Sequence, residues 1–409
     1  PTANIVTGNN YIWMTLLGLS SGGFFYAFAD QTSQIRYVFC NSSGTVLSGT
    51  NSSGALPKAI PGASLQTYGV LTTIEVGSNI NLYWTPVSYN NVPYNQFLAQ
   101  VNTSTYNPVL VSSTTTVTGT PSGTAGTTVV STATPTKSYV YSANTETLTN
   151  VTAFTTNSTA PAATVITSTA CDMLSSTTLP NGNILIAYRN TSTFAVSVAV
   201  YSSAMVLQQT ISVATSFTGS FGLKVSALSS GKFVVMVPTA TNVLTLYLYS
   251  SSYAFVSSTT IPVGTIALTT RSIMPYMASL SNDRVVVAAQ VGGTTTEFQY
   301  FVYDATLTLI SNTTGITAVT GPLYQVSVAG DSSGGFNINC IDAGANVGIF
   351  TGYRNNGGSY TAYASNITFS ASDTTWNRPT AFIQGGVYAV QGNSGSTAYI
   401  ATVNETSYR

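Results

Sequence analysis

The chain has 409 residues, of which only 5% are charged, and its eleven basic and eleven acidic residues cancel. Ordinary soluble domains contain about 25% charged residues, whereas 117 residues here are serine or threonine. Histidine is absent, which excludes His-based catalysis and His metal ligands. Eleven scattered Lys and Arg residues cannot neutralise a phosphate backbone. We therefore expect no nucleic-acid partner.

Eight apolar strands begin at nearly constant intervals along the chain, each after a short polar turn. Their first apolar residues, 49 to 56 residues apart, are Phe24, Ile80, Val129, Ile184, Phe233, Val285, Phe336 and Val387. A period near 50 is typical of propellers, solenoids and arrays. The residues left over at the two ends complete one more interval of similar length, which favours a ring over an open solenoid.

One unit is clear enough to predict four strands, A to D, in chain order. These strands are Gly222–Leu228, Phe233–Met236, Val243–Tyr249 and Tyr253–Ser258. The turn Ser229-Ser230-Gly231 has residues that tight hairpins favour. Polar and apolar residues alternate in strand C, which predicts a strand exposed on one face. Because no helical periodicity longer than a turn or two occurs, we expect an all-β fold.

The polar turn before strand B recurs with similar residues in several units. Its copies are Leu19-Ser20-Ser21-Gly22, Leu179-Pro180-Asn181-Gly182, Leu228-Ser229-Ser230-Gly231, Leu280-Ser281-Asn282-Asp283 and Asp331-Ser332-Ser333-Gly334. Period and pattern together resemble the β-propeller repeat proteins, and loosely the propeller modules of phage tail fibres and other extracellular adhesins. The resemblance implies a single closed β-propeller of about eight four-stranded blades around a channel. Unit 3, Thr115–Pro161, is the weakest, and as a long insertion it would leave seven blades.

We expect one domain over residues 1–409. The predicted blade units are approximately 10–60, 61–114, 115–161, 162–216, 217–266, 267–317, 318–370, and 371–409 together with 1–9. The last unit ends before a full strand D, and Ala3–Thr7 has no partner of its own. We predict that this segment pairs with Thr397–Val403 and so removes an open sheet edge. The alternative is a frayed terminus.

Two groups of residues are candidates for a binding site. In a propeller the A strands line the channel, and the predicted A strands carry four charged residues: Asp172, Lys224, Arg271 and Arg378. They predict a polar channel mouth for a small ligand or a glycan, or else isolated charges in a solvated channel. The second group pairs Tyr188 with Arg189 and Tyr353 with Arg354. These pairs would stack on a sugar, or else cover a sheet edge.

Cysteines and apolar runs give no sign of a cofactor, a metal or a membrane span. Cys40, Cys171 and Cys340 fall in predicted strands of different units, which is typical of small buried apolar residues. An odd count argues against a disulfide framework, and their spacing does not match a zinc site. No run approaches the roughly 18 apolar residues of a membrane span.

Three classes of function fit this composition. The first is a non-enzymatic virion or cell-surface module that binds a receptor or glycan as part of a fibre or surface assembly. It is favoured because Tyr, Asn, Ser and Thr supply aromatic platforms and adaptable hydrogen bonds. The second is a purely structural subunit of a capsid, fibre or surface layer. The third is a carbohydrate-active enzyme, which needs two carboxylates in one pocket, whereas Asp30, Asp304 and Asp342 lie at strand ends.

The expected partners are other copies of the chain or other virion and surface proteins, together with a host glycan or receptor. The expected location is extracellular or on a virion surface.

Overall fold

The computed structural model describes residues 2–7, 13–29, 34–48, 58–64, 70–76, 78–85, 94–117, 126–131, 138–143, 171–190, 192–202, 206–216, 222–240, 243–262, 275–290, 296–342, 344–345, 347–370, 380–383, 387–394 and 397–404. Its regular structure is entirely β-strand, with no helix in these ranges. The prediction of an all-β chain is confirmed.

Six sheets have four antiparallel strands each. Five of them are β7 (Val70–Val76), β8 (Asn79–Thr85), β9 (Tyr94–Asn102) and β10 (Pro108–Val117); β13 (Cys171–Thr178), β14 (Ile184–Asn190), β15 (Val196–Tyr201) and β16 (Leu207–Ala214); β17 (Lys224–Ala227), β18 (Phe233–Ala240), β19 (Val243–Tyr249) and β20 (Phe255–Pro262); β21 (Tyr276–Leu280), β22 (Arg284–Ala289), β23 (Glu297–Tyr303) and β24 (Leu309–Thr317); β25 (Leu323–Gly330), β26 (Phe336–Asp342), β27 (Val347–Asn356) and β28 (Ser359–Ser370). The sixth joins β29 (Thr380–Ile383), β30 (Val387–Ser394) and β31 (Thr397–Asn404) to β1 (Thr2–Thr7).

Two further sheets differ in size. The first along the chain has five strands, β2 (Trp13–Gly18), β3 (Phe24–Ala29), β4 (Gln34–Cys40), β5 (Val46–Ser48) and β6 (Lys58–Ser64). The other pairs β11 (Gly126–Ser131) with β12 (Ser138–Ala143) and lies in the weakest predicted unit. Described strands fall within the predicted units except β6 and β10, which run past the expected limits at 60 and 114.

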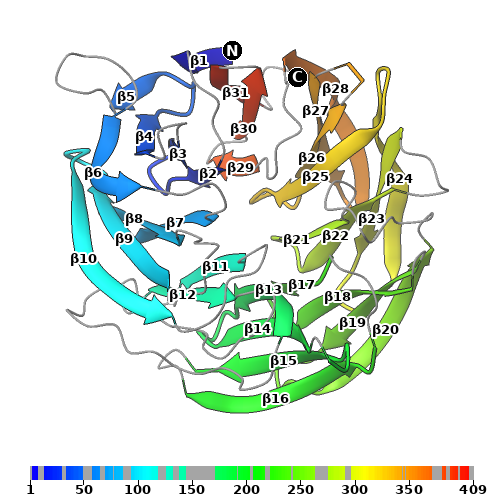
Figure 1. Ribbon diagram of the computed structural model, residues 1–409. Helices are drawn as coiled ribbons and strands as arrows, with labels where there is room; N and C mark the ends of the chain where they lie inside the picture. Colours follow the sequence, from blue (N-terminus) through cyan, green and yellow to red (C-terminus); the bar gives the residue numbers. More distant parts are fainter. Residues whose placement is uncertain are drawn as a thin grey trace.

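The sheets are arranged around a common centre, with one strand of each sheet innermost (Figure 1). The inner strands contact one another in the order β2, β7, β11, β13, β17, β21, β25, β29 and back to β2. We call the strands of each sheet A to D from the centre outward. Five predicted B strands, β3, β14, β18, β26 and β30, begin at the predicted residue, and β8 and β22 begin one residue earlier. The eighth prediction, a B strand that starts at Val129, is wrong, because Val129 lies inside β11, which contacts the inner strands β7 and β13.

The N-terminal strand β1 lies in the last sheet, as predicted. It pairs antiparallel with β31, with Ala3 opposite Ile400 and Thr7 opposite Thr397. The two ends of the chain therefore share one sheet, in which β1 is the outermost strand.

Strands B and C are buried on both faces, because each sheet is packed between two neighbours. Six of the seven residues of β14 are buried. In β19 the predicted exposure of one face is wrong: Thr245 is 7% exposed and Tyr249 3%, while Tyr247 is half-buried. Alternation of polar and apolar residues failed as a guide here because the hydroxyls find partners inside the protein. Thr245 Oγ1 shares a hydrogen bond of 2.7 Å with Thr239 Oγ1.

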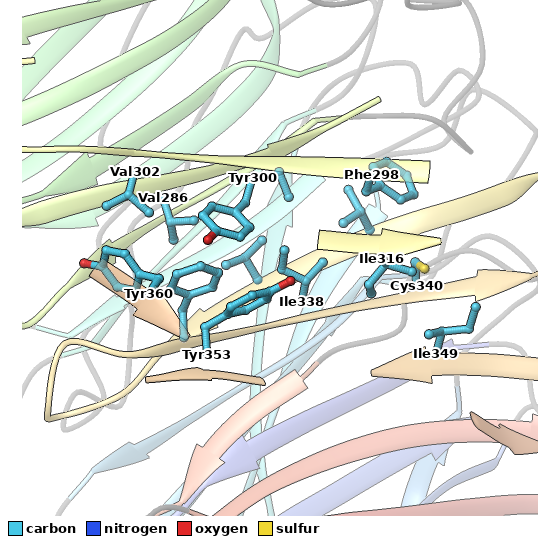
Figure 2. Close-up of a cluster of buried hydrophobic side chains, with 14 of the residues drawn as sticks. Val286, Phe298, Tyr300, Val302, Ile316, Ile338, Cys340, Ile349, Tyr353 and Tyr360 are labelled. Carbon is cyan, nitrogen blue, oxygen red and sulfur yellow. The ribbon is translucent and has the colours of Figure 1, made fainter. Parts of the chain in front are cut away.

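Each described seam between sheets is filled by interlocking apolar side chains. Figure 2 shows the seam between the sheets β21–β24 and β25–β28, where Val286, Tyr300 and Val302 face Ile338 and Tyr353. The rings of Tyr300 and Tyr353 lie 4.7 Å apart edge to face, and Phe336 stacks on Tyr353 at 4.9 Å. Each such pair contributes about 0.5–1.5 kcal/mol beyond its buried area. The seams are therefore specific as well as hydrophobic.

Two predicted core cysteines lie in these seams. Cys340 belongs to the cluster of Figure 2, and Cys40 is buried on strand C of the first sheet. Both are free thiols. Burial raises the pKa of Cys40 to about 12, so neither reactivity nor metal binding is favoured there. Cys171 begins β13, and its side chain lies outside the described part.

Most of the described A–B and C–D turns share one hairpin geometry, whereas the turns after Val76, Asn102 and Asn356 differ in length. In the A–B turns the N–H of the first residue donates to the carbonyl of the fifth, and the N–H of the fourth donates back to the first, as in Leu228 to Lys232 and Gly231 to Leu228. The fourth residue is left-handed: φ is +83° at Gly231, and Asp283 takes the same position at +62°. Three C–D turns have the same two hydrogen bonds, and their first residues are Asn41, Ser250 and Asp304.

These turns all lie on one side of the ring. Ser230 bonds Asp283 in the next A–B turn, and Lys232 reaches Ala305 in the next C–D turn. We call this side the AB–CD face and the opposite side, formed by the B–C and D–A connections, the BC–DA face.

Deleting residues 1–7 should lower the melting temperature by several degrees, because β31 would lose its hydrogen-bonded neighbour and become an open edge. Deleting residues 405–409, which lie beyond β31, is the matched control and should change it little. Equal melting temperatures for the intact chain and the N-terminal deletion would contradict a stabilising role for the β1–β31 pairing.

Candidate functional site

Three of the sequence-predicted site residues lie at the BC–DA ends of neighbouring strands. Asp172 lies on β13 and Lys224 begins β17. The register places Asp172 directly opposite Arg189 of β14. Arg271 and Arg378 lie outside the described residues.

A hydrogen bond between the two sheets holds this arrangement in place. The backbone N–H of Val225 donates to Oγ of the buried Ser175 at 3.0 Å. Ser175 is on the same strand as Asp172, and Val225 follows Lys224. Both charged residues therefore lie within three sequence positions of a residue that makes this bond. Strand β14, which carries Arg189, also contacts β17.

The B–C turn of the same sheet adds an exposed aromatic ring. Asn190 Oδ1 accepts the N–H groups of Ser192 and Thr193 at 2.8 and 2.9 Å, and its carbonyl accepts that of Phe194. The turn holds Phe194 at φ +59° and 40% exposed. The guanidinium carbon of Arg189 lies 5.3 Å from the centre of this ring. The cation therefore backs an aromatic surface that faces outward.

A second aromatic ring lies beside Lys224. The ammonium nitrogen is 4.7 Å from the centre of the Tyr276 ring, at the start of the next inner strand. Gly222, at φ +105°, leads into β17, and a Cβ there would lie 2.9 Å from Pro238 Cγ and 3.4 Å from Pro275 Cγ. Only glycine lets the chain enter the strand at this point. We call Asp172, Arg189, Phe194, Lys224 and Tyr276 the rim cluster.

The predicted pairings of Tyr188 with Arg189 and of Tyr353 with Arg354 are not formed. Tyr188 is 8% exposed and Tyr353 4%, because adjacent residues of a strand point to opposite faces. Each arginine contacts another ring instead: Arg354 lies 5.0 Å from the ring centre of Tyr363.

The two tyrosines belong to the core. Tyr353 donates its hydroxyl hydrogen to the carbonyl of Gly315 at 2.9 Å, and burial raises its pKa. Arg354 ends strand C and so lies toward the AB–CD face, away from the rim cluster.

Sequence reasoning missed Phe194 and Tyr276. A local signal existed for Phe194, since an Asn followed by three small hydroxyl residues is typical of a capped turn. No local signal marks Tyr276, because its contact with Lys224 crosses from one sheet to another.

Charged side chains are kept from full exposure in the described part of the chain. Every charged side chain whose exposure the structure describes is buried or half-buried. Asp342, at the end of β26, is fully buried and accepts four backbone N–H groups, from Val319, Thr320, Gly344 and Ala345. Burial alone would raise the pKa of Asp342, but these donors outweigh it and hold the pKa below its usual range.

The described residues include no group of three or more Cys, Asp or Glu side chains able to hold a metal ion. Within the same ranges there is also no helix long and apolar enough to cross a membrane.

Comparison with solved structures identifies the fold. The chain is similar to the Dos1 propeller, with 11% identity over 98% of this chain and 94% of that chain and a TM-score of 0.59. It is less similar to a fungal lectin from Aleuria aurantia with a six-bladed β-propeller fold (11% identity, 92% and 100% covered, TM-score 0.44) and to BBS1N in complex with ARL6DN (11%, 83% and 92%, 0.47). No family model and no curated protein matches the sequence. The chain has a β-propeller fold.

Replacing Asp342 by Asn should destabilise the protein by about 2 kcal/mol at pH 7, because the amide cannot replace a buried carboxylate bonded to four donors. The folded pKa lies below the unfolded value of about 3.9, so this contribution is present above that value and is lost as the pH falls through the folded pKa. Urea unfolding at pH 7 and at about pH 2.5 measures both effects. A difference between variant and parent that does not shrink in acid would contradict this role.

Proposed function

We propose that the chain is a closed, eight-bladed propeller that acts by binding, as a non-enzymatic component of an extracellular or virion surface, and that the rim cluster holds a neutral glycan. The eight inner strands in mutual contact support the blade count, with β11 and β12 as part of the third blade. The expected partners are a host glycan or receptor, and other copies or surface proteins.

The observation that carries this proposal is the exposed ring of Phe194 beside Arg189, at the BC–DA end of a sheet whose neighbour carries Lys224, against the ring of Tyr276, at its own BC–DA end. Apolar faces of a sugar ring pack on aromatic rings, and their hydroxyls need donors and acceptors at the edge. Arg189 is 6% exposed and lies beside the ring, so it supports the platform and is shielded from solvent. A neutral sugar fits this arrangement better than an acidic one.

The described acids support binding over hydrolysis. Glycoside hydrolysis needs two carboxylates facing one pocket. Asp283, Asp304, Asp331 and Asp342 each accept backbone N–H groups of turns, and these roles keep them apart. In the rim cluster Asp172 is the single acid.

Replacing Phe194 by Ala should weaken glycan binding at least tenfold, about 1.4 kcal/mol, because the stacking surface is removed. Phe255→Ala is the matched control, since Phe255 is 58% exposed and lies toward the AB–CD face. A glycan array followed by titration of the best binder measures the effect. Equal loss in both variants would contradict the site, and turnover of a glycan that Asp172→Asn abolishes would contradict a binding role.

Binding should change little between low and high salt, because no described charged side chain is exposed enough to attract a distant ion. The same array at two ionic strengths tests this. An affinity that falls steeply with salt would instead indicate a charged ligand.

A further inference from the structure

Much of the AB–CD face is built from one repeated turn. The A–B and C–D turns of this kind close with the same hydrogen-bond pattern, and the fourth residue of each has a φ between +62° and +90°. Turns of equal length on sheets of one ring project to similar heights. Serines occupy many of their exposed positions, as in Ser229, Ser230, Ser251 and Ser252.

The charges of this face are satisfied within the chain. Glu75 accepts the N–H and hydroxyl of Ser20 at 2.7 and 2.8 Å, and Asp283 accepts the N–H of Ser230 at 2.8 Å. Asp304 and Asp331 each cap their own turn.

The cations of the face are engaged in the same way. Lys232 donates to the carbonyl of Ala305 at 3.0 Å, and Arg284 donates to the Tyr360 hydroxyl at 3.1 Å. Another surface can therefore approach the face without leaving a bare charge against it.

An apolar rim borders the face where the outer strands begin. Leu207, Phe255 and Leu309 are 49%, 58% and 44% exposed, and each lies opposite the tyrosine that ends strand C of its own sheet. Val206 and Val256 extend the rim, at 59% and 49% exposed. These residues occupy equivalent positions on three successive sheets, so the apolar character belongs to the repeat and not to one irregular loop.

We propose that the AB–CD face binds the same face of a second copy of the chain, so that two rings stack about a two-fold axis. Such an interface uses one patch on both partners and so must be complementary to itself. The described acids of this face bond within the chain, and Lys232 and Arg284 do so too, so these groups meet that condition without bringing bare like charges together. The inference is independent of glycan binding, which it leaves to the BC–DA face.

The size of the surface also fits a second copy. A stable interface uses about 20–30 residues on each side, and the described turns and outer strand starts of this face expose more than twenty. Apolar residues at the rim and small hydroxyl residues inside it would be buried together. A side-by-side contact through one outer strand would cover far fewer residues, because the rim of a ring is convex.

The test is the mass of the full chain in solution over about a hundredfold range of concentration, by light scattering after gel filtration. We expect a dimer of twice 42.6 kDa. The double variant Leu207→Lys and Phe255→Lys should shift the protein to monomer, with dimerisation at least tenfold weaker. Val319→Lys is the matched control, since Val319 is 56% exposed and lies on the opposite face; it should remain dimeric. Thermal unfolding of each variant confirms that it is folded.

Hydrogen exchange on the intact chain locates the contact. Protection on dimerisation should appear in the A–B and C–D turns, including 229–231 and 250–254. A monomer at every concentration would overturn the proposal and leave the face to a different protein. Protection confined to the middle of β16 or β20 would overturn it in favour of edge pairing. Loss of the dimer in Val319→Lys would place the contact on the other face.

Discussion

Burial of both faces of every sheet is the constraint on which this molecule depends. A sheet packed between two neighbours has no solvent face, so the described B and C strands are mainly apolar, and Phe24, Phe25 and Tyr26 are fully buried in succession. Polar residues inside these strands, such as Asn337, Asn339 and Thr245, are buried as well. The regular spacing of apolar runs in the sequence follows from this packing, because each sheet must supply the same pair of faces to the next.

The same constraint explains what the sequence could and could not predict. Strand starts such as Phe233 and Phe336 were predictable, since a turn of fixed residue types precedes a fully apolar run. Burial of Thr245 was not, because a hydroxyl bonded inside the core looks like one facing water. The candidate site was predicted only in part. Asp172, Arg189 and Lys224 lie at the same ends of neighbouring strands, but the rings that Arg189 and Lys224 contact come from a turn and from another sheet, which local patterns do not specify.

The scarcity of charge has a structural counterpart in how the few charges are used. Asp283 illustrates it: burial alone would raise its pKa, but hydrogen bonds from Ser230 and Ser229 hold the pKa below its usual range. Asp283 thus stands at the turn position that glycine holds in other turns. Its carboxylate also bonds the preceding A–B turn. Acids that accept hydrogen bonds from turn amides have a structural role, and they contribute little to the electrostatic field outside the protein.

The two faces of the ring consequently differ in chemistry although they are made by the same strands. On the AB–CD face most described turns have one geometry, so the repeat itself makes much of this surface uniform. The BC–DA face is formed by connections of unequal length, and this freedom allows Phe194 to be held at a left-handed φ beside Arg189. Uniformity suits contact with an identical surface and irregularity suits recognition of a particular ligand. A ring that binds a second copy of the chain through the AB–CD face would therefore leave the BC–DA face free. This is the arrangement expected of a repeated component of a surface assembly.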